Sequence, residues 1–244
     1  MNLYIIVEGE QTEMKVYPEW LHFLAPQLEK VDDAWSIKPD SDSYYFFSAG
    51  GIPSIFKHVS NAVADINDIN DINASSDAKY DFLVVCIDVE EESREYIEEK
   101  INGQLEKDKR KLNDNTKLMI FEHKICMESW FLGNRKILKD NPQNPLMLKY
   151  LRFYNVKNDD PELMDNIDSE EFATKTQFHF QYLRCVMQER NIRYSKNNPK
   201  EVCNLKYLEE LINRFNKTGH ISSFGQWYKF IGCPVRCTNF SSLF

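Results

Sequence analysis

Short apolar segments alternate with longer amphipathic ones over the first 140 residues. Leu3–Val7 and Tyr80–Ile87 are continuous apolar runs, which is the pattern of strands buried on both faces of a parallel sheet. Asp42–Ser48 and Thr116–Glu122 add two further strand candidates. The alternation predicts an α/β fold, a parallel sheet with helices on both faces. The helices are expected over 10–28, 52–66, 93–111 and 126–138.

One stretch of low complexity follows the second predicted helix. Residues 65–73 repeat Asp-Ile-Asn three times. The spacing of the Ile residues is compatible with a helix, but Asn and Asp favour turns. We therefore expect a ragged helix end or a loop there.

The pattern changes after residue 140. Residues 141–170 begin with Asn-Pro-Gln-Asn-Pro and continue as a polar, acidic stretch, which predicts a loop or linker. Residues 171–244 contain two helical patterns, at about 172–190 and 205–217. The sequence thus predicts a domain over 1–140, a linker over 141–170 and a mainly helical, basic region over 171–244 that packs on the domain.

Charge is distributed unevenly along the chain. The net charge of −8 argues against a passive nucleic-acid coat. Residues 1–120 hold 12 Lys and Arg against 24 Asp and Glu, whereas residues 172–244 hold 11 against 4. A basic tail rich in Tyr and Phe raises the question of nucleic acid binding.

The sequence also bears on location. No apolar run reaches the roughly 18–20 residues that span a bilayer, so no membrane association is expected. The segment from Met1 to Glu8 lacks the basic start of a signal peptide. With these features, the six Cys are interpreted as reduced thiols and the expected location is the cytoplasm.

Carboxylates follow three of the predicted strands. Glu8 follows the first, Asp88 and Glu90 follow the central one, and Glu128 follows the last. Because the carboxyl ends of parallel strands meet at one edge of a sheet, these acids are expected to share that edge. Each alone fits equally well as a residue of a helix start. Together they favour a site for Mg²⁺ or Mn²⁺, which prefer oxygen ligands.

These residues resemble a known family. Glu8-Gly9 after the first strand and Asp88-Val89-Glu90 after a later one are similar to the Toprim domain, whose pattern is a Glu after the first strand and Asp-x-Asp after a later strand, binding Mg²⁺. Here Glu90 replaces the second Asp, a departure that keeps the charge but makes the side chain one methylene longer. The resemblance implies a Toprim- or Rossmann-like sheet.

The chain most resembles the RloB-like stand-alone Toprim proteins, which are related to the overcoming-lysogenization-defect nucleases. Three segments carry the resemblance. Residues 8–13 read Glu-Gly-Glu-Gln-Thr-Glu, with Tyr17 following, and residues 127–132 read Met-Glu-Ser-Trp-Phe-Leu. Residues 194–196, Tyr-Ser-Lys, look like the family's Tyr-x-Lys. The match covers residues 1–140 well and the remainder loosely.

The resemblance implies a role for each acid. Glu8 would be a metal ligand or a general base, and Glu13 would lie beside the metal ions. Asp88 would be the firmest ligand, with Glu90 as its partner. Glu128 would be a further ligand or an acid that supports one.

The resemblance also suggests how substrate is held. Lys196 would steady the phosphate or protonate the leaving oxygen, since a Lys is a compact cation for phosphate. Arg193 and Tyr194 would contact nucleic acid beside it. For Lys196 a solvated surface residue remains the alternative. His123, next to the predicted site, is interpreted as structural.

The expected function is that of a Mg²⁺-dependent (or Mn²⁺-dependent) nuclease acting on tRNA or DNA. RloB-like proteins are commonly encoded beside an ATPase of the ABC or AAA type and are implicated in defence against phage, so the resemblance implies an effector with such a partner, and a homodimer. The alternative is a non-catalytic Toprim-like subunit that binds or regulates the ATPase. A phosphotransferase with an aspartyl-phosphate is disfavoured, because it would need Asp-x-Asp at the first strand.

Overall fold

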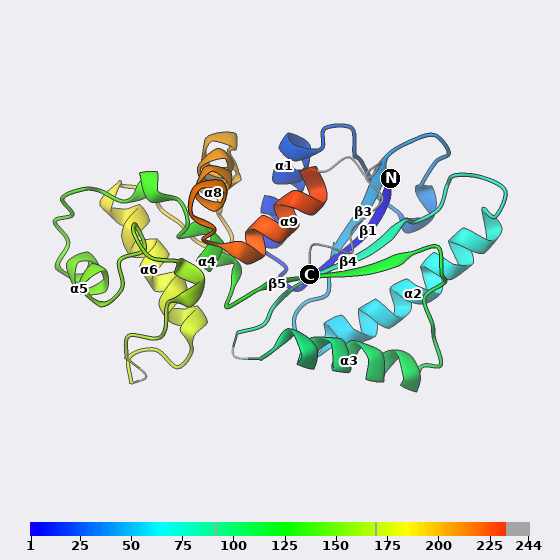
Figure 1. The fold of residues 1–244 in the computed structure, drawn as a ribbon, viewed down its shortest axis with the longest axis horizontal. Helices are drawn as coiled ribbons and strands as arrows, with labels where there is room; N and C mark the ends of the chain where they lie inside the picture. Colours follow the sequence, from blue (N-terminus) through cyan, green and yellow to red (C-terminus); the bar gives the residue numbers. More distant parts are fainter. Residues whose placement is uncertain (91, 169, 233–244) are drawn as a thin grey trace. The chain divides into compact units, whose positions relative to one another are not determined.

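The computed structural model describes residues 1–90, 92–168 and 170–232 (Figure 1). The chain forms two compact units. The first consists of Met1–Ile87 and Glu92–Glu122 together with Ile231 and Gly232, and the second of Asp88–Glu90 and His123–Phe230 without residue 169. Each unit is described below by itself.

A five-stranded parallel sheet forms the centre of the first unit, with the strand order β2-β3-β1-β4-β5. β1 lies between β3 and β4, and its apolar side chains are buried. The arrangement confirms the predicted α/β class and is consistent with a Toprim- or Rossmann-like fold. The strands are β1 (Asn2–Val7), β2 (Glu29–Val31), β3 (Ser43–Ser48), β4 (Phe82–Asp88) and β5 (Lys117–His123).

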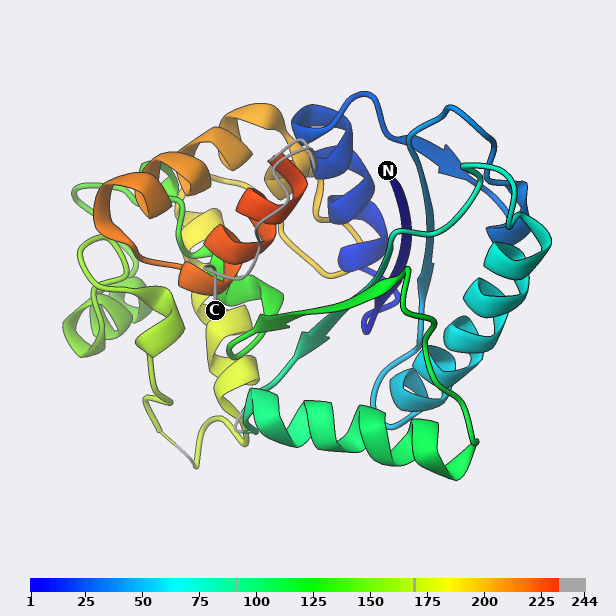
Figure 2. The same ribbon diagram turned by 45° about the vertical axis from the view of Figure 1, so that its right-hand side comes forward.

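Three helices connect the strands: α1 (Glu13–Leu24), α2 (Ser54–Ile72) and α3 (Arg94–Lys107). A 3₁₀ turn at Ala34–Ser36 lies between β2 and β3. The chain passes from β1 to β3 in one direction along the sheet and from β3 to β4 and β5 in the other. Because parallel crossovers are right-handed, α1 covers one face, and α2 and α3 cover the other (Figure 2).

The expectation of a ragged end over 65–73 is wrong, because α2 continues to Ile72. Ile66 and Ile69 are fully buried, so the packing of the repeat overrides the turn preference of its Asn and Asp residues. Asn70 is also buried, and its side chain bonds the backbone N–H of Tyr80 at 2.8 Å. The three-residue edge strand β2 was not predicted, since its residues are mostly exposed and carry no apolar pattern.

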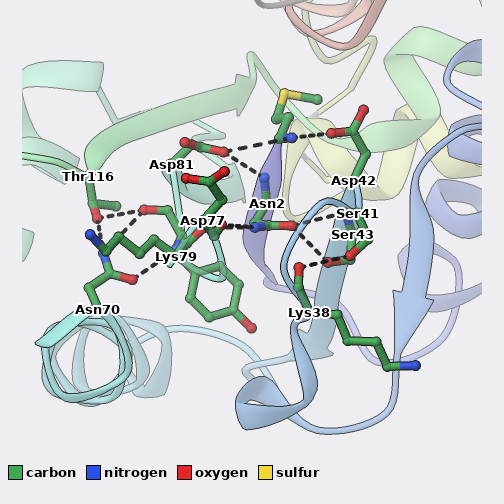
Figure 3. A network of polar contacts seen from close by, with 12 residues as sticks. Asn2, Lys38, Ser41, Asp42, Ser43, Asn70, Asp77, Lys79, Asp81 and Thr116 are labelled. Atoms are coloured by element: carbon green, nitrogen blue, oxygen red, sulfur yellow. Dashed lines mark hydrogen bonds and ion pairs between the residues drawn. The ribbon is translucent and has the colours of Figure 1, made fainter. Parts of the chain in front are cut away.

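A polar network ties the amino ends of the strands together (Figure 3). The Asn2 side chain donates to the Lys79 carbonyl at 2.8 Å and accepts from the Ser43 backbone N–H at 3.1 Å. The amino group of Met1 bonds Asp42, and the backbone N–H of Asn2 donates to Asp81 at 2.7 Å. The acids at this end of the sheet therefore serve to align β1 with its neighbours.

The second unit is helical and is built around α4 (Met127–Phe131), all five residues of which are buried. The Trp130 ring packs against Phe224 and Trp227, and its Nε1–H donates to Ser223 at 2.7 Å. The other helices are α5 (Pro145–Phe153), α6 (Lys175–Glu189), α7 (Lys200–Cys203), α8 (Leu205–Thr218) and α9 (Ser222–Gly232), with 3₁₀ turns at Arg135–Ile137 and Pro161–Leu163.

Two expectations for this region differ from the structure. The helix expected over 126–138 is interrupted after Phe131, and only a 3₁₀ turn follows. Residues 141–170, expected as a loop or linker, contain α5, which begins with Pro145 in its first turn and a side-chain cap from Asn144. The helix is stabilised by the packing of its buried Met147 and Tyr150. The local Pro and Asn residues, on which the expectation of a loop was based, do not indicate this packing.

Candidate functional site

In the first unit, a tight loop follows β1. The backbone N–H of Glu8 donates to the Cys86 carbonyl at 3.1 Å, so the pairing of β1 with β4 continues to Glu8. Glu13, in the first turn of α1, is buried and its carboxylate accepts from the backbone N–H of Gly9. Glu8 itself is half-buried. The two predicted acids thus lie close together in the sequence, with Glu8 in the short loop after a central strand and Glu13 at the start of the helix that follows.

In the second unit, Asp88 and His123 form a close pair. Asp88 Oδ1 lies 2.6 Å from His123 Nδ1, and the backbone N–H of Val89 donates to the His123 carbonyl at 3.0 Å. The His123 side chain is fully buried, whereas 25% of the Asp88 side chain is exposed. The edge of the His123 ring packs on Trp130, with 4.4 Å between ring centroids. His123 therefore fixes the Asp88 carboxylate from the buried side and leaves it reachable from solvent.

Glu128 is a buried carboxylate in the same unit. It is 2% exposed, in the first turn of α4, and its Oε1 accepts from the Tyr194 hydroxyl at 3.1 Å. Burial raises the pKa of Glu128, and the neighbouring charge of Asp88 raises it further, while Lys196 and the Tyr194 hydrogen bond act in the opposite direction. A cation beside Asp88 and Glu128 would relieve this cost of holding two acids together.

The Tyr194 to Lys196 segment contributes from a loop after α6. Tyr194 is buried against Phe131, whereas Lys196 is exposed and its Nζ lies 5.9 Å from the centre of the Phe180 ring. Lys196 is near enough to lower the pKa of Glu128. Arg193 is exposed. The structure therefore brings Tyr194 and Lys196 near Asp88 and Glu128, which are far from that loop in the sequence.

Glu90 does not follow the expected geometry. β4 ends at Asp88, and Glu90 lies exposed in the following turn with a φ of 47°. Two residues of an extended strand that are two positions apart share one face, but the strand does not reach Glu90, so Asp88 and Glu90 are not related in this way. The metal role of Glu90 remains a prediction.

His123 was interpreted as structural, and the structure places it in contact with Asp88, which was not predicted. A His at a strand end is usually structural, and the residue has no motif around it. The available signal was its place, because His123 ends β5 just as Asp88 ends β4. Ends of adjacent strands at one sheet edge are where side chains meet.

Comparisons with known proteins do not assign this chain to a family. No family model, curated protein or solved structure matches this chain. Over the described residues, the helices are too short or too polar for any of them to cross a membrane.

Proposed function

We propose that this chain is a metal-dependent nuclease of the Toprim type, similar to RloB-like proteins, that hydrolyses phosphodiester bonds of tRNA or DNA. The observation that carries the proposal is the grouping of Asp88, His123, Glu128 and Lys196 in one unit. The grouping puts two acids and a buried imidazole together with an exposed cation. Acids that bind metal and a Lys that faces phosphate are the parts that phosphodiester hydrolysis needs.

The donor set fits a divalent cation. Asp88 and His123 each offer one ligand atom in the second unit, and in the proposal the resemblance adds Glu8, Glu13 and Glu128 to the set. Carboxylates suit Mg²⁺ and Mn²⁺, and the imidazole shifts the preference toward Mn²⁺.

The metal would supply charge for the phosphate and a more acidic bound water. The side chains would do the rest. Glu8 accepts the proton of the attacking water, and Lys196 donates a proton to the leaving oxygen. Tyr194 holds Glu128 in place through its hydroxyl. The exposure of Lys196 supports its role, because a phosphate must reach it from solvent.

The proposal keeps the expected biological setting. The sequence has no Gly-x-x-x-x-Gly-Lys-Ser/Thr motif, so an ATP-driven step would belong to a partner ATPase of the ABC or AAA type. We propose a cytoplasmic effector of phage defence, acting as a homodimer, that such a partner controls.

The test is a cleavage assay with purified protein on plasmid DNA and on total tRNA, in Mg²⁺, Mn²⁺ or EDTA. Asp88→Ala is expected to lower the cleavage rate at least about 1,000-fold, because it removes the central ligand. The matched control is Asp114→Ala, which removes a carboxylate that is 95% exposed and is expected to cleave normally.

Equal cleavage by Asp88→Ala and wild type would refute the proposed site. If neither protein cleaves, even when the proposed partner ATPase is added, Mn²⁺ binding distinguishes a nuclease from a non-catalytic subunit. A non-catalytic regulatory subunit would show no Mn²⁺ binding by calorimetry, and wild type and Asp88→Ala would be alike.

A further inference from the structure

A pocket lies on the second unit where α6 meets the loop that follows it. Phe180, Arg184 and Gln188 are spaced by four residues and so share one face of α6. The pocket has a volume of about 390 Å³, within the usual range for ligand sites of about 300–1,000 Å³. It is lined by Arg184, Gln188, Arg193, Tyr194, Ser195 and Asn198.

The loop that forms the second wall is held in shape by its own backbone. Ser195 and Asn198 form an antiparallel bridge. The backbone N–H of Asn198 donates to the Ser195 carbonyl at 2.9 Å and lies 3.1 Å from the Ser195 hydroxyl. The pocket is therefore formed before any ligand enters, which lowers the entropic cost of binding.

The lining is positively charged. It contains two guanidinium groups and no carboxylate. In the described part of the chain, neither Arg184 nor Arg193 forms an ion pair with Asp or Glu; Arg184 instead contacts the Phe180 ring and the Gln181 side chain. Arg190, on the same helix end, is different, because it donates to three backbone carbonyls. Arg184 and Arg193 thus have charge available for an anionic ligand.

The pocket is joined to the proposed metal centre by one residue. Tyr194 lines the pocket, and its hydroxyl donates to Glu128 at 3.1 Å. Lys196 follows Ser195 on the same loop and acts on the charge of Glu128. A ligand in the pocket would lie beside the groups that the proposed function assigns to cleavage.

We propose that this pocket binds one nucleotide of the substrate, next to the bond that is cut. Arg184 and Arg193 hold its phosphate, and Gln188, Ser195 and Asn198 offer hydrogen bonds to its sugar or base. This inference rests on the proposed function, because it assigns the ligand from that activity, but its test does not require cleavage.

The test measures binding in a protein that cannot cut. Asp88→Ala protein in EDTA is titrated into fluorescein-labelled single-stranded DNA and RNA oligonucleotides of one sequence, with anisotropy as the readout. Adding Arg184→Gln or Arg193→Gln is expected to weaken binding about tenfold each, as for a lost charged hydrogen bond. Affinity falls as the salt concentration rises, and each variant is also expected to make the slope of log affinity against log salt shallower by about 0.7.

The control is Arg152→Gln, which removes an exposed charge from α5, outside the pocket lining. Its affinity and salt slope are expected to stay close to those of the parent, apart from a small general loss of charge. Far-UV circular dichroism checks that all three variants fold. The RNA and DNA arms report which polymer the pocket prefers.

The outcomes separate the two proposals. If both pocket variants bind like Arg152→Gln, or if the parent binds neither oligonucleotide, the pocket proposal is overturned whatever the cleavage assay shows. If binding depends on Arg184 and Arg193 while the wild-type protein never cleaves, the pocket stands and the nuclease proposal fails.

Discussion

Two buried glutamates of the second unit, Glu210 and Glu128, have opposite surroundings. Both are 2% exposed. Glu210, on α8, bonds Arg135 at 2.9 Å and Lys136 at 3.2 Å, and Asn213 adds a third donor. Burial alone would raise the pKa of Glu210, but these donors together hold it below its usual value. Glu128 accepts from Tyr194 and lies near Asp88, and its pKa is raised, mainly by burial.

The difference separates a carboxylate that is bonded to its counter-charges from one with a raised pKa, to which the proposed function assigns a metal ligand. Glu210 has its counter-charges within the chain, so it needs nothing further. Glu128 has Lys196 nearby as a counter-charge, but it also lies near Asp88, and in the proposed function a divalent cation would offset the two acids. The two side chains have the same exposed fraction, but two cations bond Glu210, whereas the cost of burial dominates at Glu128 and raises its pKa.

The largest effect is expected from removing Glu210. Glu210→Ala leaves Arg135 and Lys136 without their carboxylate, and we expect the free energy of unfolding to fall by about 3–4 kcal/mol. Urea unfolding followed by circular dichroism measures it. The neighbouring exposed acid gives the control, since Glu209→Ala is expected to change stability by less than about 0.5 kcal/mol. Equal losses of stability in both variants would contradict the structural role given to Glu210.

A slightly smaller effect is expected from acid, through His179, which lies under α4 and bonds Ser129 at 2.9 Å. Burial lowers the pKa of His179 to about 4. The unfolded chain takes up this proton near pH 6.5, so it holds more protons than the folded chain between the two values. Stability is therefore expected to fall by up to about 3 kcal/mol as the pH drops from 6.5 to 4.

The check is urea unfolding at pH 7, 6 and 5 for wild type and His179→Gln. Glutamine keeps a donor for the Met164 carbonyl, which His179 Nε2 contacts at 2.9 Å, but it does not titrate. The variant should lose stability less steeply toward acid than wild type. Parallel curves would mean that His179 takes no part in the acid response.

The smallest effect is expected at Glu128. Because its folded pKa is raised, the folded chain keeps this proton longer than the unfolded chain, and stability falls as the pH rises above about 4.5. Glu128→Gln removes that cost, so the metal-free variant should melt slightly above wild type at pH 8 and close to it at pH 4. Added Mn²⁺ should stabilise wild type more than the variant. A lower melting temperature for Glu128→Gln without metal would show that Glu128 is structural, like Glu210.

Much of the sheet was predictable because its strands are apolar runs. β1, β3, β4 and β5 lie close to the expected ranges. The errors came where packing decides against local preference: the Asp-Ile-Asn repeat is helical because Ile66 and Ile69 are buried, and α5 forms within the expected linker. The helix α9, which packs Phe224 and Trp227 around Trp130, was not anticipated either.

The candidate site was predictable only in part. Asp88 and Glu128 follow predicted strands, so sheet topology brings them toward one edge. The nearness of Lys196 to Glu128 depends on how α6 and its loop pack, which neither periodicity nor spacing reveals, and that prediction came from the resemblance. The contact between Asp88 and His123 could not be predicted, because that would require knowing the register of β4 against β5 to the exact residue.

The loop after β1 has a consequence for inheritance. The Glu13 carboxylate occupies the space that a side chain at Gly9 would need. A substitution at position 9 would therefore displace Glu13 even though the codon for Glu13 is intact. Position 9 is therefore expected to accept only glycine for as long as the Glu13 carboxylate stays bonded to the backbone N–H there.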